Sequence, residues 1–184
     1  KKSLTSRQSV ISRNLYPPRV SDFEENSLNL LHAYGWEESG FPFAWVQDFN
    51  SYLDGITVMS SQVKKILVDN GVSIPISVCN LGLDHFQNLD VENNFFLRAK
   101  KFKFLHVSSC FPRKGIEQLL ESYGNTFSKY DDVSLVIKTF NNPHNKIFSI
   151  LKNYRKKNIL FPDVQIINNE LTDSHLKSLY LLCD

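Results

Sequence analysis

The second half of the chain alternates short apolar segments with longer amphipathic ones. The apolar segments cover residues 102–107, 133–138 and 164–167, and apolar positions spaced three or four residues apart follow each of them. Short continuous apolar runs are typical of buried strands, and the wider spacing is typical of helices. Three strand–helix units in succession predict the α/β class, with a parallel sheet and right-handed crossovers.

The first half of the chain carries a similar but less regular alternation. Strands are predicted over residues 28–34, 56–59 and 74–79, with the last at an edge or beginning at Pro75. One helix is predicted over residues 43–53, and a second has apolar side chains at positions 63, 66 and 67. Ser60 and Ser61 suit the N-cap of that second helix, and Gly71 suits its end. Residues 81–94 are rich in Asn and Asp and show no period, which predicts a domain boundary.

Composition excludes several classes of protein. Hydrophobic residues make up 42% of the 184 positions, enough for a core, and the formal net charge of +2 gives no support for a nucleic-acid surface. The cysteines at positions 79, 110 and 183 are widely separated and lack metal-site spacing, which favours a reducing cytoplasm. No apolar run approaches the roughly 20 residues of a membrane span. The first residue is Lys1, so we expect a fragment.

The turn between residues 107 and 116 is the strongest candidate for a binding site. It ends in Arg113, Lys114 and Gly115, where the sequence predicts that a helix begins. Two cations at a helix N-terminus oppose the helix dipole, so they are either a tolerated surface pair or partners for a phosphate. Ligands of parallel sheets bind beyond the carboxyl ends of the strands. The loops 108–113, 139–143 and 168–171 are all predicted at that end.

A dinucleotide is poorly supported as the ligand of this turn. The turn reads SSCFPRKG and holds one glycine, whereas the dinucleotide fingerprint needs several glycines there. A phosphate-binding loop of the GxxxxGK[ST] type is also absent from the sequence. Side-chain cations would therefore have to meet the phosphates, Arg as a planar fork and Lys as a point charge.

Two longer segments resemble a known enzyme family. SSCFPRKGIEQLLESYGNTF followed by DVSLVIKTF is similar to the start of the C-terminal domain of retaining GT-B glycosyltransferases of family 4. YGWEESGFPFAWVQDFNSYLDGITVMSSQVKKILVDNGVSIPISVCNLGLDHF resembles the end of the N-terminal domain in such enzymes. The resemblance covers nearly the whole chain and depends on the order and spacing of several motifs.

The resemblance implies a GT-B fold with Rossmann-like parallel sheet layers, incomplete at both ends. Residues 1–80 would belong to the acceptor-side domain, 81–96 to an interdomain linker with its hinge at Gly82 and Asp84, and 97–184 to the first half of the nucleotide-sugar donor domain. The family's E-x7-E carboxylates would lie beyond Asp184, so the catalytic residues are unknown and the fragment is expected to be inactive.

The resemblance also implies binding residues. Lys114 matches the lysine that binds the donor phosphate. The family's arginine follows the first strand, where this chain has Ser108 and Ser109, and Arg113 is the substitute. Lys138 brings a third cation to the same end of the sheet. The remaining donor-loop candidates are Ser109, Gly115, Ile167, Asn169 and Glu170.

The implied function is transfer of a sugar from a nucleotide-diphosphate donor to a glycan or lipid-linked acceptor in polysaccharide biosynthesis. The enzyme would be cytoplasmic, hexosyltransferase-like and retaining, with neither cofactor nor metal, since no Asp-x-Asp motif occurs. A non-catalytic nucleotide- or phosphate-binding module is the alternative, and an NAD-dependent oxidoreductase is the weakest candidate.

Other polar side chains have plain structural interpretations. His32 and the pair Glu37–Glu38 are interpreted as a hydrogen-bonded histidine and surface acids rather than an acceptor site. His106 is interpreted as a satisfied core histidine, and His144 as a residue that opens a helix. The run Arg155–Lys157 ends a helix, where cations complement the dipole. Peripheral contact of this run with anionic lipid at the inner face of a membrane is the alternative.

The aromatic residues Trp36, Trp45 and Phe49 are expected to pack together in the core rather than to form a platform for a sugar.

Overall fold

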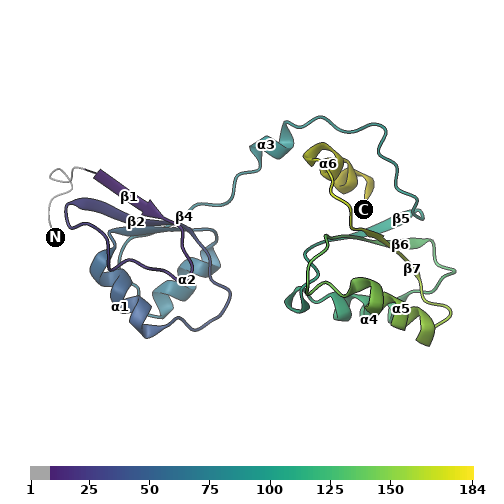
Figure 1. Ribbon diagram of the computed structural model, residues 1–184, viewed down its shortest axis with the longest axis horizontal. Helices are drawn as coiled ribbons and strands as arrows, with labels where there is room; N and C mark the ends of the chain where they lie inside the picture. Colours follow the sequence, from purple (N-terminus) through teal and green to yellow (C-terminus); the bar gives the residue numbers. More distant parts are fainter. Residues whose placement is uncertain (1–8) are drawn as a thin grey trace. The chain divides into compact units, whose positions relative to one another are not determined.

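The computed structural model describes residues 9–184 and divides the chain into two compact units between Leu83 and Asp84. Each unit contains one parallel sheet with helices packed on it (Figure 1). The α/β class predicted from the alternating pattern is confirmed.

The first unit has a four-stranded sheet in the order β1-β2-β3-β4, with every pair of neighbours parallel. Helices α1 and α2 lie on the same face of this sheet (Figure 1). The elements are β1 Ser9–Arg13, β2 Ser27–Tyr34, α1 Phe43–Tyr52, β3 Gly55–Val58, α2 Ser61–Asp69 and β4 Ile76–Val78.

The core of the first unit combines aliphatic side chains with a cluster of aromatic rings. Phe49 is fully buried, and Phe41 lies 5.8 Å from Trp45 and 5.0 Å from Trp36 between ring centroids. Edge-on ring pairs at these distances add to the free energy of burial. Phe49 lies in the core and the partly buried Trp36 and Trp45 pack against it, so these aromatic residues serve packing, as expected.

The ends of α2 follow the sequence signals. Ser60 is the N-cap, and its side chain accepts a hydrogen bond of 3.2 Å from the backbone N–H of Val63. Gly71 follows the helix with a φ of 99°, a conformation that glycine adopts without a steric penalty. Both predictions are confirmed.

Three features of the first unit differ from expectation. Strand β1 was not predicted, because its side chains are mostly exposed and its segment SVISR lacks a continuous apolar signal. Strand β4 covers residues 76–78 only, although it does lie at the sheet edge. Helix α1 ends at Tyr52, one residue before the predicted end, because Leu53 is its C-cap and has an extended backbone.

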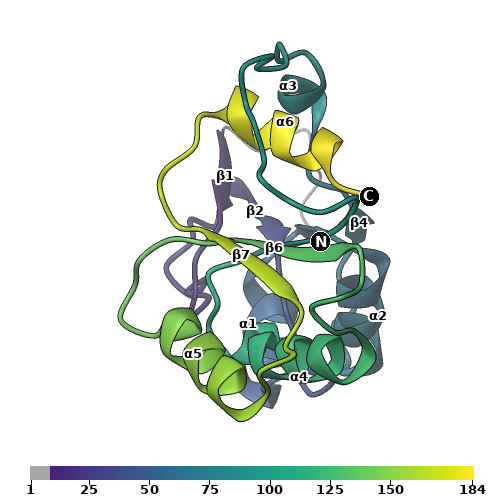
Figure 2. The ribbon, with the colours of Figure 1, turned by 90° about the vertical axis from the view of Figure 1, so that its right-hand side faces the viewer.

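The second unit has a three-stranded parallel sheet in the order β5-β6-β7. Helices α4 and α5 cover one face of the sheet and α6 covers the other (Figures 1 and 2). The elements are α3 Asp84–Gln87, β5 Phe102–Val107, a 3-10 helix Pro112–Lys114, α4 Ile116–Thr126, β6 Val133–Lys138, α5 Ile147–Lys157, β7 Asp163–Ile167 and α6 Asp173–Leu182.

Burial differs between the central strand and its neighbour. The four inner residues of β6 are buried, as its apolar sequence predicts for a strand covered on both faces. Strand β5 lies at an edge, and Phe102 and Phe104 are partly exposed. The backbone N–H of Asp184 donates a hydrogen bond of 3.0 Å to the carbonyl of Lys103 on that edge.

The segment before β5 packs on α6. The Lys177 ammonium donates hydrogen bonds of 2.7 Å to the carbonyls of Gln87 and Leu89, and the Glu92 N–H donates one of 2.8 Å to the Ser178 hydroxyl. These bonds explain why residues from Asp84 onward group with the second unit. The assignment of residues 81–96 as a linker between two enzyme domains stays a prediction.

Candidate functional site

The three strands of the second sheet end in register at one edge. Val107 is paired with Lys138, and Lys138 with Ile167. Beyond these pairs, the Ser108 N–H donates to the Lys138 carbonyl at 3.1 Å and the Thr139 N–H donates to the Ile167 carbonyl at 2.9 Å. The loops that follow β5, β6 and β7 therefore leave from one place, where parallel sheets bind ligands.

The loop after β5 is fixed by hydrogen bonds. The Ser108 hydroxyl accepts a bond of 3.0 Å from the Cys110 N–H and lies 2.7 Å from His106 Nε2. Cys110 is buried and has a φ of 53°, which few residues other than glycine adopt. Asn142, in the loop after β6, donates a bond of 2.9 Å to the Ser109 carbonyl. The two loops therefore hold each other in place.

The start of α4 differs from the expected one. The sequence predicts a helix start at Arg113–Gly115, whereas in the structure a 3-10 turn over Pro112–Lys114 comes first and α4 begins at Ile116. Pro112 opens the 3-10 turn, and Gly115 ends it with a left-handed φ of 68°. This conformation reverses the chain direction sharply and favours glycine.

No side chain caps α4. Gly115 occupies the N-cap position and supplies no side-chain hydrogen bond. The first N–H groups of a helix lack partners within the helix, so those of Ile116, Glu117 and Gln118 need an external acceptor, either water or an anion. Side chains cap α2 and α6, through Ser60 and Thr172, whereas α1 begins without a side-chain cap, as α4 does.

The predicted cations lie in the turn before α4 and at the end of β6. The side chains of Arg113 and Lys114 are exposed within the 3-10 turn. Lys138 ends β6, is partly buried, and donates a bond of 2.7 Å to the Thr139 carbonyl. The structure thus places all three cations on the loops or strand ends of the same sheet edge.

The remaining donor-loop candidates lie at the end of β7 and beyond it. Ile167 ends β7, and its carbonyl accepts the hydrogen bond from Thr139. Asn169 and Glu170 are exposed, and the Asn169 amide donates a bond of 3.2 Å to the Glu170 carbonyl. The backbone of this loop is accessible at the same edge as the turn after β5.

Sequence reasoning missed two asparagines that shape the site. The Asn145 side-chain amide donates a hydrogen bond of 2.9 Å to the Thr139 hydroxyl. Its oxygen accepts one of 3.1 Å from the Ile147 N–H at the start of α5. The Asn142 side chain, which donates to the Ser109 carbonyl, also accepts a hydrogen bond of 3.0 Å from the His144 N–H. The segment NNPHN directly after a strand was the available signal, since Asn side chains often bond to the backbone in turns.

A cavity of about 310 Å³ lies beside the first turn of α4. His144 faces Phe111 at 5.4 Å between ring centroids. The expectation that His144 opens a helix was wrong, because α5 begins at Ile147 with Lys146 as its N-cap. Lys146 adds a further cation to the wall of the cavity, and Glu117 an acid. The lining residues are Cys110, Pro112, Ile116, Glu117, Gln118, His144, Lys146 and Ile150.

His106 has the environment of a structural histidine. It is partly buried, hydrogen-bonded to Ser108, and its pKa is lowered from 6.5 because burial disfavours the charged imidazolium. In the first unit, His32 is exposed, with Nδ1 lying 2.8 Å from the Ser12 hydroxyl. Neither histidine lies in a constellation that indicates acid–base chemistry.

Two searches of residues 9–184 gave negative results. These residues contain no group of three or more His, Cys, Asp or Glu side chains arranged to hold a metal ion. They also contain no helix that is both long enough and apolar enough to cross a bilayer.

Comparison with known proteins supports the fold. No protein-family model matches the chain, and no curated protein matches it. Among solved structures, the chain is similar to a UDP-forming α,α-trehalose-phosphate synthase from Burkholderia xenovorans, with 12% identity and a TM-score of 0.54. The likeness covers 88% of this chain and 52% of the other, so this chain spans about half of that protein's length. The expected GT-B type of fold, with Rossmann-like parallel layers, is confirmed.

Proposed function

We propose that this chain is part of a glycosyltransferase and that its second unit holds the diphosphate of a nucleotide-sugar donor. The acceptor is a glycan or a lipid-linked molecule in the synthesis of a polysaccharide in the cytoplasm. The observation that carries the proposal is the uncapped start of α4, which follows Arg113 and Lys114 in the turn after β5, at the carboxyl edge of the sheet where Lys138 ends β6.

The chemistry of this edge suits a diphosphate. Free N–H groups and the positive end of the helix dipole attract an anion, and the fixed left-handed Gly115 orients them. Arg113 offers a planar pair of donors, and Lys114 a mobile point charge. In sugar transfer, negative charge grows on the leaving diphosphate, so cations already in place lower the barrier. The loop Ile167–Glu170 would contact the nucleobase, with Ser109 close to the phosphates.

The finer assignment follows the sequence resemblance to family 4. A retaining mechanism without a metal fits the absence of an Asp-x-Asp motif from the sequence. The carboxylates of the family would lie beyond Asp184, so the isolated chain is expected to bind a donor without transferring its sugar. The similar solved structure is described as UDP-forming, which makes UDP the first nucleotide to test.

The test is calorimetric titration of UDP and GDP into the chain, with and without EDTA. One of the two should bind, and EDTA should leave the affinity unchanged. Arg113→Ala and Lys114→Ala should each weaken binding about tenfold or more, since a charge-assisted bond is worth about 1.5–3 kcal/mol. Lys64→Ala with Lys65→Ala removes the same charge from exposed positions on α2 and is the matched control.

Unchanged affinity in Arg113→Ala/Lys114→Ala would refute the diphosphate site. Binding that requires Mg²⁺ or Mn²⁺ would refute the metal-independent mechanism. Tight binding without transfer by any longer form of the protein would favour the non-catalytic nucleotide-binding module.

A further inference from the structure

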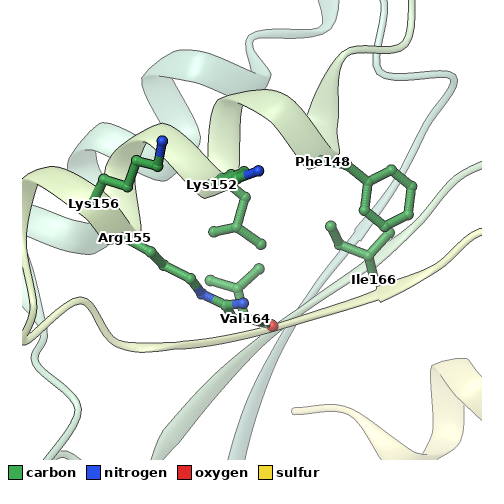
Figure 3. Close-up of a pocket in the computed structure, with 7 residues that line it drawn as sticks. Phe148, Lys152, Arg155, Lys156, Val164 and Ile166 are labelled. Atoms are coloured by element: carbon green, nitrogen blue, oxygen red, sulfur yellow. Dashed lines mark hydrogen bonds between the residues drawn. The ribbon is translucent and has the colours of Figure 1, made fainter.

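An open groove lies at the β7 edge of the second unit's sheet, between helix α5 and strand β7. Its volume is about 510 Å³. It is lined by Phe148, Leu151, Lys152, Arg155, Lys156, Val164 and Ile166, which are drawn in Figure 3. None of these residues belongs to the diphosphate site at the carboxyl edge.

The floor of the groove is apolar and its geometry is fixed. Val164 and Ile166 come from β7, the edge strand of the sheet, and the ring of Phe148 lies toward Ile166 (Figure 3). Arg155 Nη2 donates a hydrogen bond of 2.9 Å to the Val164 carbonyl, which holds the guanidinium at the strand edge. Phe148 is 53% exposed although it lines the groove. The groove therefore presents uncovered apolar surface beside an anchored cation.

Positive charge is concentrated around this groove. Residues 133–162 hold six Lys or Arg residues and no Asp or Glu, in a chain whose formal net charge is only +2. Phe148, Lys152 and Lys156 follow one another at four-residue intervals, so they form one stripe on α5. The helix dipole favours the cations in the last turn of α5, and Lys152, in the middle of the helix, extends the positive charge beyond that turn.

We propose that the groove and this stripe, together the α5–β7 face, dock on an anionic lipid bilayer. Phosphate headgroups would meet the ammonium groups of Lys152 and Lys156, while the Phe148 ring would enter the region between headgroups and acyl chains. Cations combined with exposed aromatic and aliphatic side chains are typical of helices that lie in the membrane interface. Ile159, which follows α5 and is 85% exposed, adds apolar surface near the helix end.

A free phosphate or a nucleic acid would use only part of this surface. Either could bind the cations, but neither accounts for an uncovered Phe148 over an apolar floor. A lipid surface satisfies both parts at once, because its headgroups are anionic and its interior is apolar. The proposal is independent of the diphosphate site, since it concerns the groove between α5 and edge strand β7 and not the carboxyl edge of the sheet, and it needs no nucleotide.

Co-sedimentation of the chain with vesicles tests the proposal. At 0.1 M salt, we expect binding to vesicles of phosphatidylglycerol and phosphatidylcholine and not to pure phosphatidylcholine. Lys152→Glu with Lys156→Glu should weaken binding by at least about tenfold, since each basic side chain near an anionic surface contributes appreciably. The control is Lys64→Glu with Lys65→Glu on α2, which changes the net charge equally and should bind nearly as the parent does.

A second variant distinguishes binding to a membrane from binding to any polyanion. Phe148→Ser keeps every charge, so it should weaken vesicle binding several-fold and leave binding to poly(U) RNA unchanged. Circular dichroism confirms the fold of each variant. Absence of binding to the anionic vesicles would overturn the proposal. Equal losses in the α2 control, or RNA binding without vesicle binding, would overturn it as well.

Discussion

The two units contain strand-to-helix turns of the same kind that end differently. In the first unit, β3 passes to α2 through Met59 and Ser60, and the Ser60 hydroxyl accepts a hydrogen bond from the first turn of α2. In the second unit, β5 passes to α4 through residues 108–115, with a 3-10 turn, exposed cations and no side-chain cap. The β3–α2 turn supplies a hydrogen-bond acceptor for a backbone N–H of its own helix. The β5–α4 turn supplies no such side chain, so the first N–H groups of α4 can bind water or an anion.

A missing side-chain cap is shared with α1, so the distinguishing feature of the β5–α4 turn is that this cap is missing beside the two exposed cations Arg113 and Lys114. A side-chain N-cap stabilises a helix by about 1 kcal/mol, so its omission at α4 has a cost. The two cations add a further unfavourable interaction with the helix dipole. A diphosphate bound at this place would reverse both effects. We therefore interpret the β5–α4 turn as a site whose stability depends on its ligand.

Among the variants that test this difference between the two turns, Gly115→Val is expected to have the largest effect on stability and on UDP binding. Its left-handed φ of 68° is costly for a residue with a side chain, by about 1–2 kcal/mol, and more for a β-branched one. The variant should lower the midpoint of thermal unfolding and also weaken UDP binding, because the helix start moves. The control is Gly40→Val, where added atoms meet open space. Equal thermal shifts in both variants would contradict the account.

Ser60→Ala should have a smaller effect, confined to stability. Loss of the N-cap bond to Val63 should cost the first unit about 1 kcal/mol, measured by urea unfolding. Nucleotide affinity should not change, because this turn is closed by its own side chain. A loss of UDP binding in this variant would show that the two turns do not differ in the proposed way.

The smallest expected effect is on the pH dependence of the second unit's stability. Burial lowers the pKa of His106 in the folded chain below its ordinary value of 6.5. The unfolded chain therefore takes up a proton first as the pH falls through about 6.5, and the second unit loses stability on acidification. His106→Gln should flatten the dependence of urea unfolding on pH below neutrality. An unaltered pH profile in that variant would assign the effect to other groups.

Much of the fold followed from local pattern. The bounds of β5 and β6 were predicted from apolar runs, and the cap Ser60 from residue type at a helix start. Strand β1 was not predicted, because Val10 is 64% exposed and its segment leaves little apolar signal. Strand β1 pairs with β2, whose residues lie 18 positions further along the chain, so this pairing cannot be predicted from a short stretch of sequence.

The candidate site was predictable in position but not in construction. Arg113 and Lys114 stand out in the sequence because cations are unfavourable at a helix start. The bond from Asn142 to Ser109 joins loops that are 33 residues apart, so residue type alone does not reveal it. The α5–β7 groove likewise needs Phe148 and Ile166 on adjacent elements, which only the folded chain brings together.

The most direct test of the central claim is amide NMR of the ¹⁵N-labelled chain during titration with UDP. The account predicts the largest shifts at the N–H groups of Ile116, Glu117 and Gln118 in α4. The corresponding amides of Gln62 and Val63 in α2 should stay unchanged. Shifts confined to other parts of the chain, or equal shifts at the starts of both helices, would contradict the claim that only the β5–α4 turn is built to hold a diphosphate.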